Sequence, residues 1–272
     1  MGSDDKNAFP TGDLMKGKRG LIMGVANDHS IAWGIAKSVA AQGAELAFTY
    51  QGEAFGKRVA PLAKSVGSDL VLSCDVEDEA SMDAVFAAIE EKWGGIDFIV
   101  HAIAYSDKSE LTGRYADTTR KNFLRTMDIS CFSFVDVARR ASALMNDGGS
   151  MITLSYLGAE RVVPNYNVMG VAKAALEASV RYLSRDMGPQ GIRVNAISAG
   201  PMRTLAGSAI GSARAMYNWN KTHSPMKKVT DLHHVGGSAL YLLSDLSGSV
   251  TGEVHHVDAG YHVTALPDMD DL

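Results

Sequence analysis

Cysteine is scarce in this sequence: only Cys74 and Cys131 occur among 272 residues, and neither has a cysteine or histidine neighbour at metal-ligand spacing. This count excludes a disulfide framework and favours a reducing compartment, so we expect a cytoplasmic protein. The histidine doublets at 233–234 and 255–256 lack carboxylate partners at ligand spacing, and no metal site is expected.

Long apolar runs and basic charge are also lacking. No stretch approaches the roughly 18–20 apolar residues that a membrane span requires. Residues 1–13 are polar, lack the apolar centre of a signal peptide, and are expected to be a flexible segment. The net charge of -5 argues against nucleic-acid binding, which usually needs a basic face. We therefore expect neither a membrane nor a nucleic acid as a partner.

What the chain does contain is an alternation of short apolar runs with longer helical patterns. Seven runs rich in valine, isoleucine, leucine and alanine are expected to be buried strands: 19–26, 44–50, 69–76, 96–103, 150–156, 192–200 and 252–260. Helical patterns occupy 31–43, 78–95, 118–146 and 165–188. This alternation predicts an α/β protein with a single-domain, doubly wound Rossmann fold of about seven parallel strands and helices on both faces. The domain is expected to span 14–265, followed by a polar tail at 266–272.

The turn after the first expected strand has features of a phosphate site. Gly24 and Gly34 stand ten residues apart, with Ser30 and Ile31 between them. Ser30 can cap the following helix, whose free N–H groups can hold the pyrophosphate of a dinucleotide. An ordinary strand–helix turn with a serine cap would have the same sequence, so this segment alone leaves both interpretations open.

The ends of the next two strands indicate which dinucleotide would bind. Gln51 stands where NAD enzymes carry an acid for the ribose hydroxyls and NADP enzymes carry an arginine for the 2′-phosphate. A neutral amide suits hydroxyl groups better than a dianion, which favours NADH. Asp75, followed by Val76, could accept a hydrogen bond from the adenine amino group, or Asp75 could cap a helix.

Two tyrosines and a lysine lie where a buried strand gives way to a helix. Seven residues of α-helix turn through about 700°, about 20° short of two full turns, so Tyr166 and Lys173 are expected on one face. The lysine could donate to ribose hydroxyls, and its charge is expected to lower the pKa of the tyrosine. The alternative is that Tyr156 and Tyr166 only pack and that the lysine is solvated.

Three motifs carry a resemblance to a known family: the G-x5-S-I-A-x-G turn, the tyrosine–lysine segment at 156–173, and AISAGPMRTLA at 196–206. From about residue 16 to 265 the chain resembles the short-chain dehydrogenase/reductase superfamily, in the divergent branch of NADH-dependent enoyl-acyl-carrier-protein reductases. The resemblance implies reduction of the trans-2 double bond of enoyl thioesters, the last step of the elongation cycle in type II fatty acid synthesis. NADH/NAD+ would be the cofactor, and enoyl-acyl carrier protein the substrate.

The resemblance also implies roles for individual residues. Tyr166 would donate to the thioester oxygen, Lys173 would hold the nicotinamide ribose, and Tyr156 would border the acyl site. Ile103 and Ser106 fall at positions that touch cofactor and substrate, respectively. Superfamily membership further implies a homotetramer that buries the long helices at 118–146 and 165–188.

The segment after the sixth expected strand would close the site. Backbone groups of one loop could meet the nicotinamide amide and the pyrophosphate, namely those of Met202, Arg203, Thr204, Leu205 and Ala206. Residues 207–225 are expected to form a mobile lid over an acyl chain, or else a plain surface helix. Basic residues that could meet an acidic carrier protein, or form only a solvated face, are Arg203, Lys221, Lys227 and Lys228.

Two other functions are weighed against this one. A 3-ketoacyl reductase, or another short-chain ketone/alcohol oxidoreductase, would need a tyrosine and a serine at positions that hold Met169 and Tyr156. A non-catalytic dinucleotide-binding sensor would have no reason to keep Tyr166 and Lys173 together. Both alternatives therefore fit the sequence less well.

Overall fold

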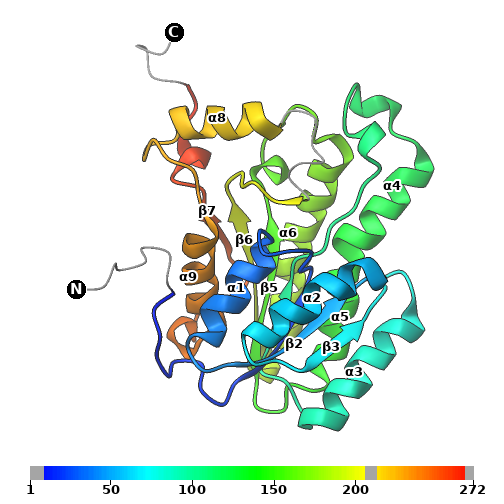
Figure 1. The fold of residues 1–272 in the computed structure, drawn as a ribbon. Coiled ribbons are helices and arrows are strands. Elements are labelled where there is room, and N and C mark those ends of the chain that lie inside the picture. The colour runs from blue at the N-terminus through cyan, green and yellow to red at the C-terminus, as the bar shows by residue number, and fades with distance from the viewer. Residues whose placement is uncertain (1–8, 206–212, 267–272) are drawn as a thin grey trace.

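The computed structural model describes residues 9–205 and 213–266, and their central element is one seven-stranded sheet (Figure 1). Its strands are β1 (Arg19–Met23), β2 (Glu45–Tyr50), β3 (Leu70–Ser73), β4 (Phe98–His101), β5 (Gly149–Ser155), β6 (Ile192–Ala199) and β7 (Val254–Val257). All pairs are parallel, in the order β3-β2-β1-β4-β5-β6-β7. The predicted doubly wound sheet is confirmed. Each strand lies inside its expected range, except that β5 begins one residue earlier, and the ends differ from those expected by at most three residues.

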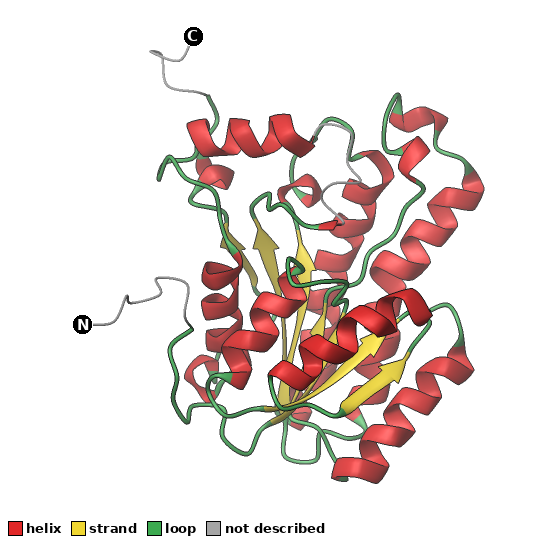
Figure 2. Ribbon diagram, in the orientation of Figure 1, coloured by secondary structure: helices red, strands yellow, loops and turns green. Residues whose placement is uncertain are grey.

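Helices cover both faces of the sheet, as Figure 2 shows, because successive strand residues point to opposite sides. Leu21 and Met23 of β1 enter the core beneath α3 (Glu79–Trp93), α5 (Ser133–Ser142) and α6 (Asn167–Met187). Ile22, between them, enters the opposite core beneath α1 (Ile31–Ala40), α2 (Glu53–Ser65) and α9 (Leu232–Leu243).

The strand order reverses at β1, which pairs with β2 on one side and β4 on the other. In open parallel sheets, ligands bind beyond the carboxyl ends of the strands at such a switch point. Gly24 follows β1 with φ +96°, and a Cβ there would lie 2.1 Å from the Ala102 carbonyl oxygen. Only glycine permits this close approach of two strand ends. Beyond the same edge lies α8 (Ala213–His223) (Figure 1).

The helix expected at 118–146 is divided in the structure. A 3₁₀ turn, Tyr115–Asp117, precedes α4 (Arg120–Met127), and a π-helical turn, Asp128–Phe132, separates α4 from α5. The Ser133 hydroxyl donates to the Ile129 carbonyl across this wider turn at 2.6 Å. Apolar periodicity does not reveal one inserted residue, so the sequence pattern could not predict the division.

The other expected helices correspond to α1, α3 and α6 within three residues at each end. The sequence analysis did not identify α2 or α9, and α2 contains Gly56 and Pro61, which weaken a helical pattern. The remaining short turns are Lys108–Glu110, η4 (Leu157–Ala159), Gly188–Gln190, Asp245–Ser247 and η7 (Tyr261–Val263).

The first described residues contact the domain. The Phe9 ring lies 4.8 Å from that of His233, and the Gly12 N–H donates to the Ala41 carbonyl. The expected domain boundaries at 14 and 265 stay a prediction. Within the parts of the chain that the structure describes, no helix has the length and apolar character needed to cross a membrane.

Two adjacent glycines of α9 should respond oppositely to substitution by alanine. A Cβ at Gly236 would lie 2.9 Å from the Gly34 carbonyl oxygen of α1, and overpacking of this kind costs about 1–3 kcal/mol of unfolding free energy. A Cβ at Gly237 would meet no described atom within 4 Å, so Gly237→Ala should add about 0.5–1 kcal/mol. Denaturant unfolding of both variants checks this, and equal midpoints would contradict the packing argument.

Candidate functional site

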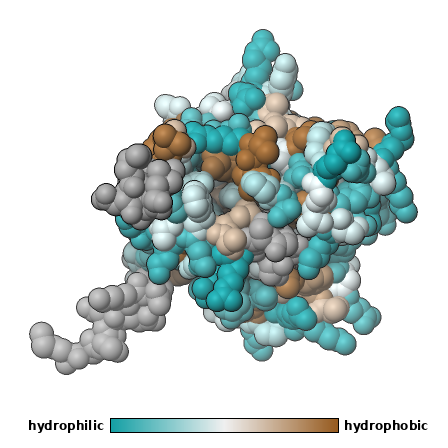
Figure 3. Space-filling view, turned by 90° about the horizontal axis from the view of Figure 1, so that it is seen from above, coloured by the Kyte–Doolittle hydropathy of each residue, from teal (hydrophilic) through white to brown (hydrophobic). Residues whose placement is uncertain are grey.

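A cavity of about 900 Å³ lies at the carboxyl edge of the sheet, within the size range of small-molecule sites. Seen from above, apolar side chains lie among hydrophilic ones at this end of the molecule (Figure 3). The predicted site residues in its wall are Gly24, Ser30, Ile31, Gln51, Val76, Ile103, Ser106, Tyr156, Tyr166, Lys173, Met202, Thr204 and Leu205. Asp75 and Arg203 are not in the wall, and Ala206 lies outside the described residues.

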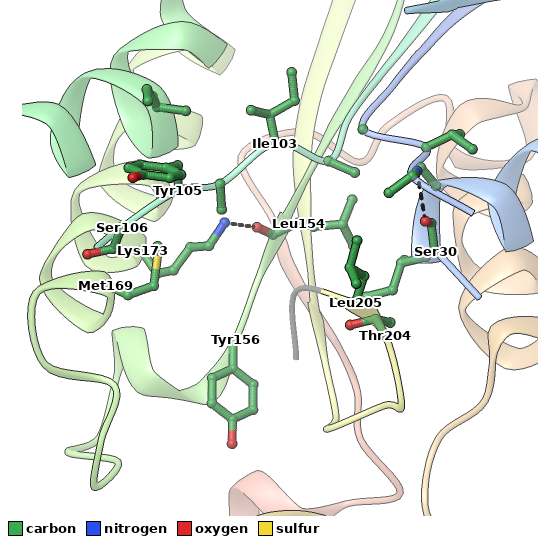
Figure 4. A pocket seen from close by; sticks show the side chains of 18 of the residues that line it. Ser30, Ile103, Tyr105, Ser106, Leu154, Tyr156, Met169, Lys173, Thr204 and Leu205 are labelled. Atoms are coloured by element: carbon green, nitrogen blue, oxygen red, sulfur yellow. Dashed lines mark hydrogen bonds between the residues drawn. The ribbon is translucent and has the colours of Figure 1, made fainter. Parts of the chain in front are cut away.

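The Ser30 side chain organises the turn after β1 (Figure 4). Its hydroxyl oxygen accepts from the N–H groups of Ala26 at 3.0 Å and Asn27 at 3.1 Å. Ser30 is the N-cap residue of α1, as expected, but its side chain makes no hydrogen bond to the helix. The N–H groups of Ile31 and Ala32 have no hydrogen-bond partner among residues 9–205 and 213–266. They can therefore hold a phosphate at the helix N-terminus.

Of the three residues predicted to bind the cofactor at the ends of β2 and β3, Gln51 and Val76 line the cavity and Asp75 does not. Gln51 is exposed and Val76 half-buried in the cavity wall. The Asp75 carboxylate accepts from the Glu77 N–H at 3.0 Å, inside the turn after β3. Because Asp78 caps α3, the interpretation of Asp75 as a helix cap is wrong.

The turn before α6 directs Tyr166 into the cavity wall. Tyr166 lies between Asn165, with φ +61°, and Asn167, with φ +35°. Asparagine is enriched among non-glycine residues with positive φ. The Asn167 amide donates to the carbonyls of Glu110 and Gly113, each at 3.3 Å, which fixes the turn. Only 8% of Tyr166 is exposed.

Tyr156 and Lys173 share the wall with Tyr166. The two tyrosine rings meet edge to face, with centroids 5.1 Å apart and an interplanar angle of 75°. Lys173 Nζ donates to the Leu154 carbonyl at 2.6 Å, as Figure 4 shows. Lys173 is buried, which excludes the alternative of a solvated lysine. Folding thus brings the predicted tyrosine pair and lysine together in one cavity.

Burial sets the protonation states of these groups. It lowers the pKa of Lys173 to about 8 and raises the pKa of Tyr156 to about 12. It raises the pKa of Tyr166 further still, with smaller contributions from Tyr156 and Glu177. The expected lowering of the Tyr166 pKa by Lys173 is therefore wrong. Both phenols are neutral at pH 7 and can donate hydrogen bonds.

Hydrogen bonds from α4 and the π-helical turn hold the loop that carries Ser106. Asn122 Nδ2 donates to Ser106 Oγ at 3.1 Å, and the Thr126 hydroxyl donates to it at 3.0 Å. The Tyr105 N–H donates to Ser130 Oγ at 2.9 Å, and that hydroxyl donates back to the Tyr105 carbonyl at 3.0 Å. The π-helical turn therefore fixes one border of the cavity.

His101 joins β4 to β5 and to the first residue of α5. Its ring nitrogens lie 3.0 Å from Thr153 Oγ1 and 2.9 Å from Ser133 Oγ, and burial lowers its pKa to about 3. The ring is therefore neutral at pH 7. Sequence reasoning gave no role to His101 or Ser130, because no sequence spacing connects them and only the π-helical turn brings Ser130 to the loop.

The loop after β6 divides between the cavity and α8. Thr204 and Leu205 lie across the cavity from Tyr105 (Figure 4). The Arg203 guanidinium instead lies 4.7 Å from the centre of the Tyr217 ring.

The expected lid is described only from residue 213 onward, where α8 contributes Met216 to the cavity wall. Residues 207–212 lie outside the described residues. The mobility of the segment stays a prediction.

Two histidines of the doublets have carboxylate partners, contrary to the expectation from the sequence. His234 Nδ1 lies 2.8 Å from Asp231 Oδ1, and His256 Nε2 lies 2.6 Å from Glu160 Oε1. In the described part of the chain, no three histidine, cysteine or acidic side chains form a group that could hold a metal ion.

Known proteins resemble this chain over nearly its whole length. A family model described as enoyl-(acyl carrier protein) reductase matches residues 24–262. The enoyl-(acyl-carrier-protein) reductase (NADH) 2 of Rhizobium meliloti is 68% identical, covering 95% of this chain and 97% of its own. The corresponding FabI of Escherichia coli is 48% identical, covering 94% and 98%.

Solved structures show the same similarity. FabI from Candidatus Liberibacter asiaticus has a TM-score of 0.93 at 58% identity, covering 95% of this chain and 100% of that chain. The reductase from Anaplasma phagocytophilum, solved in complex with NAD, has a TM-score of 0.92 at 58% identity, covering 96% and 98%.

Replacing Lys173 by methionine should stabilise the fold near neutral pH. The folded pKa of about 8 lies below the ordinary value of 10.5, so burial of the ammonium opposes folding below pH 8. This penalty shrinks as the pH rises from about 8 toward 10.5, because the folded state then loses its proton before the unfolded chain does. Lys173→Met should add about 1–3 kcal/mol of unfolding free energy at about pH 7. Denaturant unfolding should show that the difference in unfolding free energy between Lys173→Met and the wild type is smaller at about pH 9.5 than at about pH 7. A difference that does not change with pH would contradict the buried-charge explanation.

Proposed function

Because the chain belongs to the enoyl-(acyl carrier protein) reductase family, we propose that it is an NADH-dependent enoyl-(acyl carrier protein) reductase. It reduces the trans-2 double bond of enoyl thioesters in the last step of the elongation cycle of type II fatty acid synthesis. The observation that carries this assignment is that Tyr166 and Lys173 share one cavity wall, with Met169 where a ketoreductase needs its tyrosine.

The cavity residues fit a dinucleotide cofactor. The N–H groups of Ile31 and Ala32 would hold a phosphate of the dinucleotide, and Gly24, which has no side chain, lines the same cavity. Gln51 offers a neutral amide to the adenosine ribose hydroxyls. When bound, NADH supplies a hydride to the β-carbon of the enoyl thioester.

Lys173 holds the nicotinamide ribose. Its ammonium has three N–H donors, and the Leu154 carbonyl engages one of them. The remaining donors serve the ribose hydroxyls. Because the carbonyl belongs to the end of β5, the ammonium is fixed relative to the sheet before any ligand arrives.

Tyr166 stabilises the charge that the reaction creates. Hydride addition at the β-carbon moves an electron pair onto the thioester oxygen, which becomes an enolate. The buried, neutral phenol of Tyr166 donates a hydrogen bond to that oxygen. One donor placed in advance in a site that excludes water typically contributes ~3–4 kcal/mol to transition-state stabilisation. Tyr156 and Ser106, which also line the cavity, border the acyl group.

The ketoreductase alternative lacks its acid. Met169 lies in the cavity wall four residues before Lys173, and its thioether cannot transfer a proton. Tyr156 occupies the position of the serine that such an enzyme would use.

A homotetramer and a cytoplasmic location stay predictions. The neighbouring helices α4 and α6 and the π-helical turn expose Leu124 (58%), Phe132 (56%) and Tyr182 (76%), which a subunit interface would cover. A reducing compartment suits the free thiols of Cys74 and Cys131. Docking of the carrier protein on Arg203 and the lysines near α8 also stays a prediction.

Tyr166→Phe should lower kcat by about 10²–10³-fold with NADH and a trans-2-enoyl thioester. The ring packing on Tyr156 remains, so the KM for NADH should change little. NADH oxidation measures both, and Tyr115→Phe, at an exposed position, is the matched control. An acetoacetyl thioester is tested in parallel, and turnover of this keto substrate alone would transfer the assignment to the ketoreductase class.

Gln51→Arg should shift the cofactor preference. An arginine at the end of β2 would pair with the 2′-phosphate, and kcat/KM for NADPH should rise about tenfold while that for NADH falls. Initial rates with each cofactor provide the measurement. An unchanged ratio would show that residue 51 does not contact the ribose.

A further inference from the structure

The η4 turn forms one side of the Tyr166 environment. A Cβ at Gly158 would lie 2.3 Å from Cδ1 of Tyr166, so the backbone of the turn contacts the ring directly. A Cβ at Gly170 would lie 2.8 Å from the Gly158 carbonyl oxygen, so α6 supports the turn from another side. In a close-packed interior, a shift of η4 therefore moves the tyrosine ring.

Two contacts tether η4 at its ends. Before it, the buried Ser155 hydroxyl donates to the Glu177 carboxylate of α6 at 2.5 Å. After it, Arg161 Nη1 donates to the Thr264 carbonyl, beyond η7, at 3.1 Å. The second contact links the turn to the end of the described chain.

A third contact tethers η4 to β7. His256 Nε2 donates to Glu160 Oε1 at 2.6 Å, and the His256 ring stacks on that of His262 with centroids 4.0 Å apart and planes 18° apart. His262 in turn donates from Nδ1 to the buried Asp258 at 3.0 Å. The histidine that meets Glu160 is therefore itself fixed.

We propose that Glu160 and His256 are positioning residues for Tyr166, because their contact holds η4 against the tyrosine ring and so orients the phenol. The proposal rests on the function proposed above, in which Tyr166 donates to the thioester oxygen. Among the described residues that line the cavity, neither Glu160 nor His256 occurs. Their effect passes through the backbone at Gly158.

Breaking this contact should lower turnover and leave cofactor binding intact. Glu160→Ala and His256→Ala should each reduce kcat at least about tenfold with an unchanged KM for NADH, since a misplacement of 1 Å can cost about 100-fold. In Glu160→Gln the amide oxygen can still accept from His256, so most of the rate should return.

The double variant Glu160→Ala/Tyr166→Phe distinguishes a loss of Tyr166 positioning from a general loss of structure in the site. Once the phenol is gone there is nothing to orient, so Glu160→Ala should cause no further loss in the Tyr166→Phe background. An equal loss in both backgrounds overturns the proposal. An unchanged kcat in folded Glu160→Ala protein overturns it as well.

His234→Ala is the matched control, because His234 also meets a carboxylate, at 2.8 Å from Asp231, but at the start of α9. Its kcat should equal that of the wild type. NMR of tyrosines labelled with ¹³C at Cζ gives a readout without turnover, in which the Tyr166 signal is the one missing from Tyr166→Phe. Glu160→Ala should shift this signal and His234→Ala should not; an unmoved signal overturns the proposal.

The same experiments distinguish the two hypotheses. Wild-type protein that does not reduce enoyl thioesters would refute the proposed function. The Tyr166 signal would still decide whether Glu160 and His256 position the ring.

Discussion

The hydrogen bond from Lys173 to the Leu154 carbonyl is the contact on which the site depends. It joins α6 to the carboxyl end of β5 inside a sheet that helices cover on both faces. A buried ammonium requires such a partner, because burial removes most of the water that would otherwise solvate it. The bond fixes α6 against the sheet, and Tyr166 directly precedes this helix. The burial that lowers the pKa of Lys173 also raises the pKa of Tyr166 and so keeps the phenol protonated.

Local strain and close packing then complete the orientation of the tyrosine. Asn165 and Asn167 hold left-handed backbone conformations on either side of it, and Gly158 permits the backbone to touch the ring. Residues held in such conformations persist only where their surroundings enforce them. Here hydrogen bonds from Asn167 and the tethers of η4 provide that enforcement. The strained backbone at Asn165 and Asn167 lowers the stability of the fold, and in return the Tyr166 phenol has a fixed orientation.

The success of sequence reasoning differed between elements for physical reasons. The five inner strands are largely buried and form nearly continuous apolar runs, which made them predictable. The edge strands β3 and β7 are only partly buried, and they were also predicted. The division between α4 and α5 was not predicted, because one inserted residue barely alters an apolar pattern. The helix α2 was not predicted, because Gly56 and Pro61 weaken its helical pattern. Ser30 and Asp75 are good capping residues by chemistry, yet each bonds to the loop around it. Cap preference is a local tendency, and the path of the loop decides which N–H lies within reach.

The sequence by itself determined the sheet and the helix that carries Lys173. Tyr166 precedes this helix, between two residues of positive φ, so the tertiary structure and not the helical repeat brings it to the cavity. Strand alternation and the helical repeat are properties of adjacent residues, so spacing is enough to read them. Only the tertiary structure decided the charge states and the support of the site. Desolvation depends on which distant elements enclose a group, and this reversed the expected change in the Tyr166 pKa. The contact of Glu160 with His256 joins residues 96 positions apart, a distance that only folding closes.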